Sequence, residues 1–435
     1  MPVISGTDGH FIRAPAGCVS LPPVPTLAKS SNAPPRSSAL KLVLFPFLSA
    51  HIIFPVLWLV LIAQDGPRQI DWRHFQVAAE QFVSGNWADL YTERLDTVHP
   101  GYFWRYPPYA LYLVAPLAWM TPGWAYGLLA GVVVTSLAAS MVLLARLTRP
   151  SEVEAWVLAT ALSAPALSTL ITGQISALLL LCVVAAAILW TRGRVVTACA
   201  VLGLLAIKPN LGIFFGAYVI VRREWRGAAA MVAVVIGMCA LALPLGSELW
   251  ADFIRVSLSN VNVIAQYDPY KMITLRAFLG TVFGDGRIAL MLWGVIAAGL
   301  LAASAWVWRI PGSPVRNLGL VVLLAIAANP YAFFYDALLL VVPATVWWTE
   351  RDTWRRNRWT LVGVLIASTW CWEQWAHTWR EFLKFAGLGF APPFSLVGPT
   401  TALWLLLALD EARVSQSSPE LRSREDHGTH AIFQT

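Results

Sequence analysis

The carboxylate best placed for acid–base chemistry in this sequence is Asp71. It opens a segment whose apolar residues recur at the spacing that gathers them on one face of a helix, at Trp72, Phe75, Ala79 and Phe82. A carboxylate is ionised near neutral pH and can accept a proton from an attacking hydroxyl group. Asp71 could equally cap the free amide groups at the start of that helix, and the local sequence leaves both interpretations open.

Two cations stand beside or within apolar segments, Arg105 and Lys208. A lysine in an apolar segment is costly unless it meets water, an anion or a carboxylate, so Lys208 is a candidate ligand for a phosphate. The alternative is that its ammonium group reaches water at the end of an extended side chain. Arg105 is a second candidate for the phosphate, and its alternative role is to anchor a short interfacial helix.

Further polar side chains lie near the ends of apolar segments, where amide and phenol groups could hydrogen-bond a sugar: Tyr106, Gln174, Asn329, Tyr331, Tyr335 and Asp336. The alternative for these residues is hydrogen bonding between membrane helices. The segment Tyr267-Asp268-Pro269-Tyr270-Lys271 could help to bind a substrate, although residues of these types usually form a turn.

The elements that must position these residues are membrane helices. Of the 435 residues, 57% are hydrophobic, only 13% are charged and 22 are tryptophan, which is too apolar for a soluble protein. The sequence predicts an all-α polytopic membrane protein of about twelve spans. The predicted spans are residues 41–63, 123–147, 152–170, 174–190, 195–207, 210–221, 227–245, 287–308, 317–330, 333–348, 359–376 and 396–409. The short segments 195–207 and 210–221 could instead form one span that is kinked at Pro209.

The distribution of arginine predicts the orientation of these spans. With the N-terminus in the cytoplasm, every short basic joint between spans falls on the cytoplasmic side, provided that Pro107 to Trp119 lies along the outer interface. The outer loops are then residues 64–122, 246–286 and 377–395. We expect a transmembrane domain over residues 41–410 in a plasma (inner) membrane, with disordered cytoplasmic tails at 1–40 and 411–435.

Several other functions find no support in the sequence. The net charge of +7 comes from arginines scattered between apolar segments, which indicates membrane topology rather than nucleic-acid binding. The seven histidines are dispersed and form no metal-ligand spacing, and no nucleotide-binding glycine motif occurs. The five cysteines are expected to be small core residues. We therefore predict no metal and no cofactor.

The order of the polar motifs resembles glycosyltransferase family 87, over about residues 41 to 350. An aspartate opens an amphipathic helix after the first span, and the aromatic segment Phe103-Trp104-Arg105-Tyr106-Pro107-Pro108 precedes a short apolar helix. The later motifs are Gly173-Gln174, Lys208-Pro209 and Asn329-Pro330-Tyr331. The family's mannosyl-lipid branch commonly has histidine after the last motif, where this chain reads Ala332-Phe333-Phe334-Tyr335-Asp336. This difference leaves the sugar and the acceptor open.

The resemblance implies a GT-C-type helical bundle with amphipathic interfacial helices in the first outer loop. It also implies an inverting hexosyltransferase that moves a hexose, with mannose expected, from a polyprenyl-phosphate-sugar donor to a lipid-linked or cell-envelope glycan acceptor. Asp71 would be the general base, in an active site on the outer face of the membrane. The rival hypothesis is a lipid or sugar transporter or flippase, but such proteins often contain internal repeats, and we find none that is convincing.

Overall fold

The computed structural model describes residues 72–87, 90–91, 104–148, 153–161, 163–267, 271–284, 286–310, 312–350, 358–366, 369 and 395–417. Throughout these residues the secondary structure is helical, and the only pairing of extended backbone that they contain is an isolated antiparallel bridge between Met272 and Phe333. The predicted span 41–63, the predicted third outer loop and the catalytic candidate Asp71 lie outside the described residues.

Three described helices are long and apolar enough to cross a membrane. They are α4 (Pro122–Thr148), α10 (Trp225–Leu241), which continues into the 3-10 helix η6 (Leu243–Leu245), and α13 (Arg287–Trp308). Each agrees with a predicted span to within a few residues. Most of their surface is exposed and apolar, which suits contact with lipid tails. The prediction of a helical membrane bundle is confirmed, whereas the total of about twelve spans stays a prediction.

Further helices, most of them shorter, pack against these three or against one another. They are α5 (Val153–Ala161), α6 (Ala164–Thr172), α7 (Ser176–Thr191), α14 (Pro314–Ala327), η8 (Phe334–Leu340), α15 (Val341–Thr349) and α17 (Val397–Ser417). The predicted span 152–170 is thus divided into α5 and α6, because Ser163 caps a new helix whose second residue is Pro165. At the other end of the chain, α17 continues past Asp410 into the segment that we expected to begin the C-terminal tail.

Residues 195–221 form two antiparallel helices rather than one kinked span. The helices are α8 (Val195–Gly203), extended by η5 (Leu204–Ile207), and α9 (Pro209–Val221). The first helix runs parallel to α10, since Gly227 lies against Cys199 and Gly203 lies against Met231. The second helix, α9, runs antiparallel to α10, because only the short turn at residues 222–224 joins the two. The start of α8 and the end of α9 therefore lie on the same side of the bundle, and Lys208 lies at the tip of this helical hairpin.

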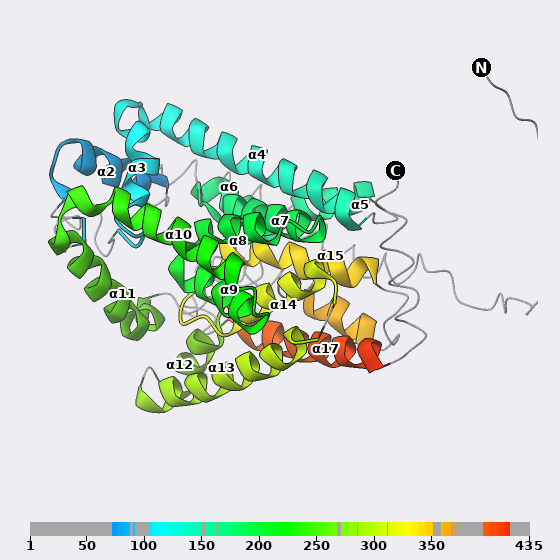
Figure 1. Ribbon diagram of the computed structural model, residues 1–435. Helices are drawn as coiled ribbons and strands as arrows, with labels where there is room; N and C mark the ends of the chain where they lie inside the picture. The colour runs from blue at the N-terminus through cyan, green and yellow to red at the C-terminus, as the bar shows by residue number, and fades with distance from the viewer. Residues whose placement is uncertain are drawn as a thin grey trace, which may run out of the picture. The chain divides into compact units, whose positions relative to one another are not determined.

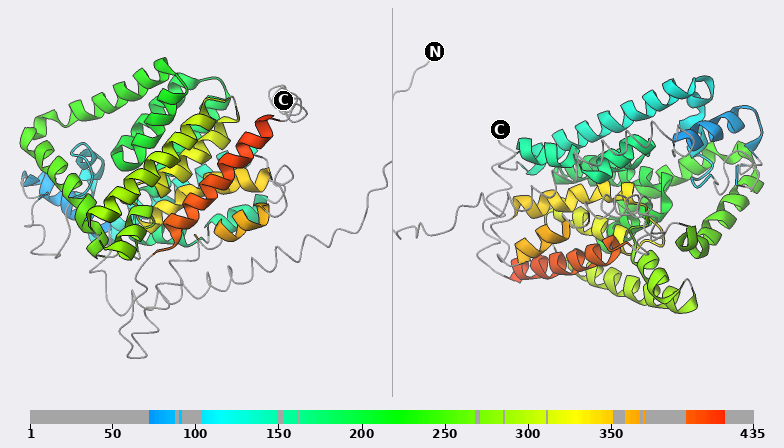
Figure 2. Two further views of the ribbon diagram at one scale, coloured as in Figure 1. Left: turned by 90° about the horizontal axis from the view of Figure 1, so that it is seen from below. Right: turned by 180° about the vertical axis from the view of Figure 1, so that it is seen from behind.

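The segment predicted as the second outer loop contains two helices that the sequence analysis did not assign. It contains α11 (Ser247–Tyr267) and α12 (Leu275–Phe283). Aromatic contacts connect α11 to the first outer segment, with ring centroids 5.9 Å apart both between Tyr91 and Phe253 and between Tyr109 and Trp250. Figures 1 and 2 show α11 at the same end of the bundle as α2 (Trp72–Val83) and α3 (Ala110–Val114).

The opposite end of the bundle carries several of the basic joints. Arg222, at the end of α9, donates hydrogen bonds to the carbonyl oxygens of Trp308 (3.0 Å) and Ile310 (3.3 Å) at the end of α13. Arg316 and Glu350 form an ion pair of 3.1 Å between the start of α14 and the end of α15. These joints lie on one side of the bundle, as the charge distribution predicts.

Candidate functional site

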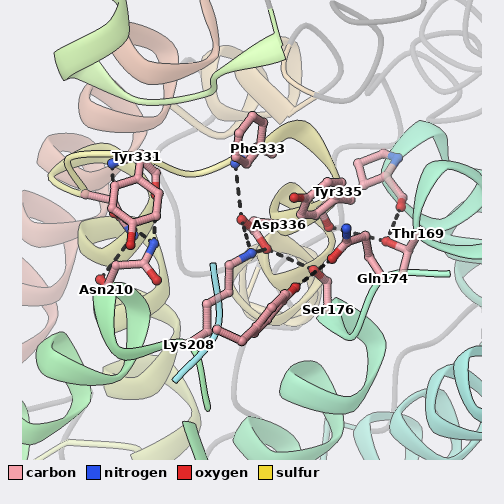
Figure 3. A network of polar contacts seen from close by, with 12 residues as sticks. Thr169, Gln174, Ser176, Lys208, Asn210, Tyr331, Phe333, Tyr335 and Asp336 are labelled. Atoms are coloured by element: carbon pink, nitrogen blue, oxygen red, sulfur yellow. Dashed lines mark hydrogen bonds and ion pairs between the residues drawn. The ribbon is translucent and has the colours of Figure 1, made fainter. Parts of the chain in front are cut away.

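Lys208 and Asp336 form a buried ion pair where η8 meets the tip of the α8–α9 hairpin (Figure 3). The ammonium nitrogen lies 2.6 Å from one carboxylate oxygen of Asp336 and 2.7 Å from the other. The side chain of Asp336 is wholly buried and that of Lys208 is 10% exposed. The sequence allowed three kinds of partner for this lysine: water, an anion or a carboxylate. In the structure its partner is the carboxylate of Asp336.

Two further donors complete the surroundings of Asp336. The hydroxyl of Ser176, at the first position of α7, donates to Oδ1 at 2.8 Å, and the backbone amide of Phe333 donates to Oδ2 at 3.1 Å. Asp336 thus accepts a hydrogen bond from the residue that precedes its own helix η8, as an acidic residue in a first helical turn commonly does. Each carboxylate oxygen has two donors, so the carboxylate is saturated.

A second set of contacts joins the aromatic segment before α3 to the start of α7. The phenol of Tyr106 donates to the amide oxygen of Gln174 at 2.8 Å, and the phenol of Tyr91 donates to the carbonyl oxygen of Tyr106 at 2.6 Å. The hydroxyl of Thr169 in α6 contacts the carbonyl oxygen of Tyr335 at 3.4 Å. Because the backbone amide of Gln174 donates to the carbonyl oxygen of Thr169, these contacts bring Tyr106, Gln174 and Tyr335 together; Figure 3 shows Gln174 and Tyr335 near each other.

Asn210 connects the hairpin tip to the loop after α14. Its amide group donates to the carbonyl oxygen of Tyr331 at 2.7 Å and to Oδ1 of Asn329 at 3.2 Å. Asn329 donates in return to the carbonyl oxygen of Asn210 at 3.1 Å, and its Oδ1 also accepts from the backbone amide of Tyr331 at 3.0 Å. Asn329 is fully buried and engaged in these contacts, which is the arrangement that the interhelical alternative predicts.

Arg105 lies over the aromatic face of the same loop. Its guanidinium carbon is 5.6 Å from the centroid of the Phe333 ring, within the range of a cation–π contact. No carboxylate among the described residues forms a salt bridge with Arg105, whereas the charge of Lys208 is balanced by Asp336. Arg105 is also close enough to Tyr331 to influence its phenol electrostatically. Burial raises the pKa of Tyr331 above its ordinary value, and the charge of Arg105 opposes this effect in part.

The start of α2 lies against the turn that presents Gln174. Gly173 ends α6 with φ of +67°, and a Cβ atom built on it would lie 2.7 Å from the Cβ of Trp72. Trp72 follows Asp71 directly in the sequence. One turn further along α2, the amide of Gln76 donates to the carbonyl oxygen of Met120 at 2.8 Å and fixes the helix to the end of η4 (Ala115–Trp119).

The structure therefore gathers all of the predicted site residues that it describes: Arg105, Tyr106, Gln174, Lys208, Asn329, Tyr331, Tyr335 and Asp336. Sequence reasoning missed Ser176, Asn210 and Phe333. Asn210 follows the recognised Lys208-Pro209 pair, so a polar residue at a predicted hairpin tip was an available signal. Ser176 and Phe333 carried no signal, because serine and phenylalanine are ordinary residues in membrane helices and their ends.

A cavity occurs at the far end of α14 and does not belong to this cluster. It is lined by residues that include Arg316, Leu320, Trp347, Glu350 and Trp404. Most of the length of α14, about 20 Å of helix, separates Arg316 from Asn329. Within the described residues, no group of three or more His, Cys, Asp or Glu side chains could hold a metal ion.

Fold and site together define a helical membrane protein with a polar cluster toward one end of its bundle. The model of glycosyltransferase family 87 matches residues 104–334, more than half of the chain. The chain therefore belongs to glycosyltransferase family 87, which confirms the resemblance and favours a membrane glycosyltransferase over a transporter. The matched range contains Arg105, Lys208 and Tyr331, whereas Asp71, Tyr335 and Asp336 lie beyond it. No curated protein matches the chain significantly.

Proposed function

We propose that this protein transfers a hexose from a polyprenyl-phosphate-hexose donor to a hydroxyl group of a lipid-linked or envelope glycan on the outer face of a plasma membrane. Mannose is the first sugar to test. The observation that carries the proposal is the meeting of Arg105, Tyr106, Gln174 and Tyr331 at one end of an apolar bundle in a family 87 chain. A donor with an isoprenoid tail can remain in the bilayer while its phosphate and sugar enter such a polar cluster.

In the proposed reaction, the acceptor oxygen attacks the anomeric carbon as the bond between that carbon and the phosphate oxygen breaks. The acceptor proton passes to the carboxylate of Asp71, and the polyprenyl phosphate leaves with the bonding electrons. Attack from the face opposite the phosphate inverts the anomeric centre. Asp71 lies outside the described residues, and its role is supported by its neighbour Trp72, which packs against the Gly173-Gln174 turn.

Arg105 is the proposed phosphate ligand. The phosphate becomes more negative as it leaves, because a diester with one charge becomes a monoester with a charge of about −1.5 to −2. A guanidinium group already held beside the reacting bond stabilises that charge without rearranging. Arg105 has this capacity because its planar group is oriented by the Phe333 ring rather than by a carboxylate of the described chain. The phenol of Tyr331 is also protonated, because burial raises its pKa, and it can donate a hydrogen bond nearby.

The decisive experiment uses the full chain in native membranes with a synthetic polyprenyl-phosphate mannose. Wild-type membranes should release polyprenyl phosphate and pass the mannose to an acceptor, and Asp71→Asn should lower the rate by about 10²–10⁴-fold. Glu80→Gln, a neutralised carboxylate on α2, is the matched control and should retain activity. Transport of the intact donor without cleavage, or full activity of Asp71→Asn, would refute the proposal. The same assay with donors that carry other hexoses identifies the sugar.

A further inference from the structure

The ion pair of Lys208 and Asp336 is too well satisfied to bind a substrate. Lys208 is the cation that the sequence favours as a phosphate ligand, yet both oxygens of Asp336 lie within 2.7 Å of its ammonium nitrogen. The ammonium nitrogen also lies 4.9 Å from the centroid of the Tyr335 ring. Asp336 takes two of the three N–H groups of Lys208, and only 10% of the lysine side chain is exposed. If Lys208 turned its charge to a phosphate instead, Asp336 would be left as a buried charge with no ionic partner, which is strongly unfavourable.

Asp336 is equally committed. Its carboxylate accepts two hydrogen bonds from Lys208, one from Ser176 and one from the backbone amide of Phe333, so no acceptor position remains for a substrate hydroxyl. It therefore does not serve as a second base beside Asp71.

The contacts of the pair lead directly to the proposed phosphate ligands. Asp336 holds the backbone of Phe333, and the Phe333 ring lies beneath the guanidinium group of Arg105. Lys208 lies two residues before Asn210, which holds the backbone carbonyl of Tyr331. Formation of the ion pair thus brings together the two backbone segments on which Arg105 and Tyr331 depend, as the view in Figure 3 illustrates for Lys208, Asp336, Phe333 and Tyr331.

We propose that Lys208 and Asp336 are a positioning pair, which sets the places of Arg105 and Tyr331 for the donor and does not itself contact the donor phosphate. The inference rests on the proposed function. A displacement of about 1 Å in a positioned group can cost about 10²-fold in rate, so a pair that touches no substrate can still control kcat. The residues act as one unit, and their effects should not multiply.

A double-mutant cycle tests this inference. We expect Lys208→Met and Asp336→Asn each to lower kcat by about ten- to hundredfold. The double variant, which buries no unpaired charge, should be no worse than the poorer single variant, and its KM for polyprenyl-phosphate mannose should stay within about threefold of wild type. If Lys208 bound the phosphate, every variant without it would raise the donor KM more than about tenfold, and the two losses would multiply. Either result would overturn the proposal.

Two controls make each outcome interpretable. The pair Arg316 and Glu350 is also ionic and partly buried, at the far end of α14, and Arg316→Met with Glu350→Gln should change thermal stability without changing kcat or donor KM. If Lys208→Met fails to accumulate, the donor KM of the double variant still decides between the two roles. Loss of activity in Asp71→Asn and Arg105→Gln, together with multiplying losses in the cycle, would retain the proposed function while rejecting the positioning pair. Full activity of both those variants would reject the proposed function itself.

Discussion

Gly173 and Trp72 are packed so closely that position 173 has no room for a side chain. A Cβ atom there would lie 2.7 Å from the Cβ of Trp72, and the residue's φ of +67° also disfavours any residue other than glycine. The contact joins the start of α2, directly after Asp71 in the sequence, to the turn that presents Gln174 to Tyr106. Two motifs that lie about a hundred residues apart in the sequence are thereby placed side by side.

Gly173→Ala should reduce both stability and activity. The left-handed conformation alone costs about 1–2 kcal/mol for a residue with a Cβ, and the clash with Trp72 adds to this. Thermal unfolding in detergent and the rate of mannose transfer measure the two effects. Gly127→Ala is the control, because Gly127 lies within α4 with nothing within 4 Å of its added Cβ. It should be neutral or slightly stabilising, and a similar loss in both variants would contradict the prediction.

Arg105→Gln should lower kcat/KM for the polyprenyl-phosphate donor by about ten- to hundredfold, the value of one or two charged hydrogen bonds to a phosphate. Arg105→Lys should recover only part of the loss, because an ammonium group lacks the planar fork that rests on the Phe333 ring. Steady-state kinetics with varied donor measure both. Arg287→Gln removes an exposed arginine at the start of α13 and should have no effect. Equal losses at both arginines would indicate a general charge effect.

Asn210→Ala should destabilise the fold by about 1–3 kcal/mol, because it removes the side-chain amide that donates to the carbonyl oxygen of Tyr331 and to Oδ1 of Asn329. The transfer rate should fall as well, since the loop that carries Tyr331 loses its contact with the hairpin tip. Asn86→Ala is the same substitution at an exposed position whose amide donates to Ser84, and it should be almost silent. An unchanged melting temperature for Asn210→Ala would show that the asparagine contacts are dispensable.

The phenol of Tyr331 should make stability fall in alkaline solution. Burial raises its pKa above the value of 10.0 that it has when unfolded, so the unfolded chain loses this proton at a lower pH than the folded one. The stabilisation is complete below pH 10 and is lost progressively as the pH rises above it. Tyr331→Phe should weaken the decline in melting temperature above pH 10, whereas Tyr112→Phe, at an exposed tyrosine, should leave it unchanged. An identical alkaline decline in wild type and Tyr331→Phe would contradict this.

The sequence by itself determined the class of fold and singled out most residues of the polar cluster that the structure contains. In apolar segments as long as α4, α10 and α13, the backbone N–H and C=O groups must be paired within a helix, because lipid offers no partner for an unpaired backbone group. The helix α11 was missed as an element, although Leu249, Phe253 and Val256 repeat at helical spacing, because the segment was assigned to an outer loop from its polarity.

Tertiary structure alone decided how the polar residues are paired. A lysine in an apolar segment requires a partner, but the local sequence does not show whether that partner is a phosphate or a carboxylate. For Lys208 the partner is the carboxylate of Asp336, 128 residues away. The same holds for Asn210, whose partners Asn329 and Tyr331 follow a different helix. The physical reason is that the cost of burying a polar group is set by its own type and surroundings, whereas the group that relieves this cost is chosen by the packing of distant helices.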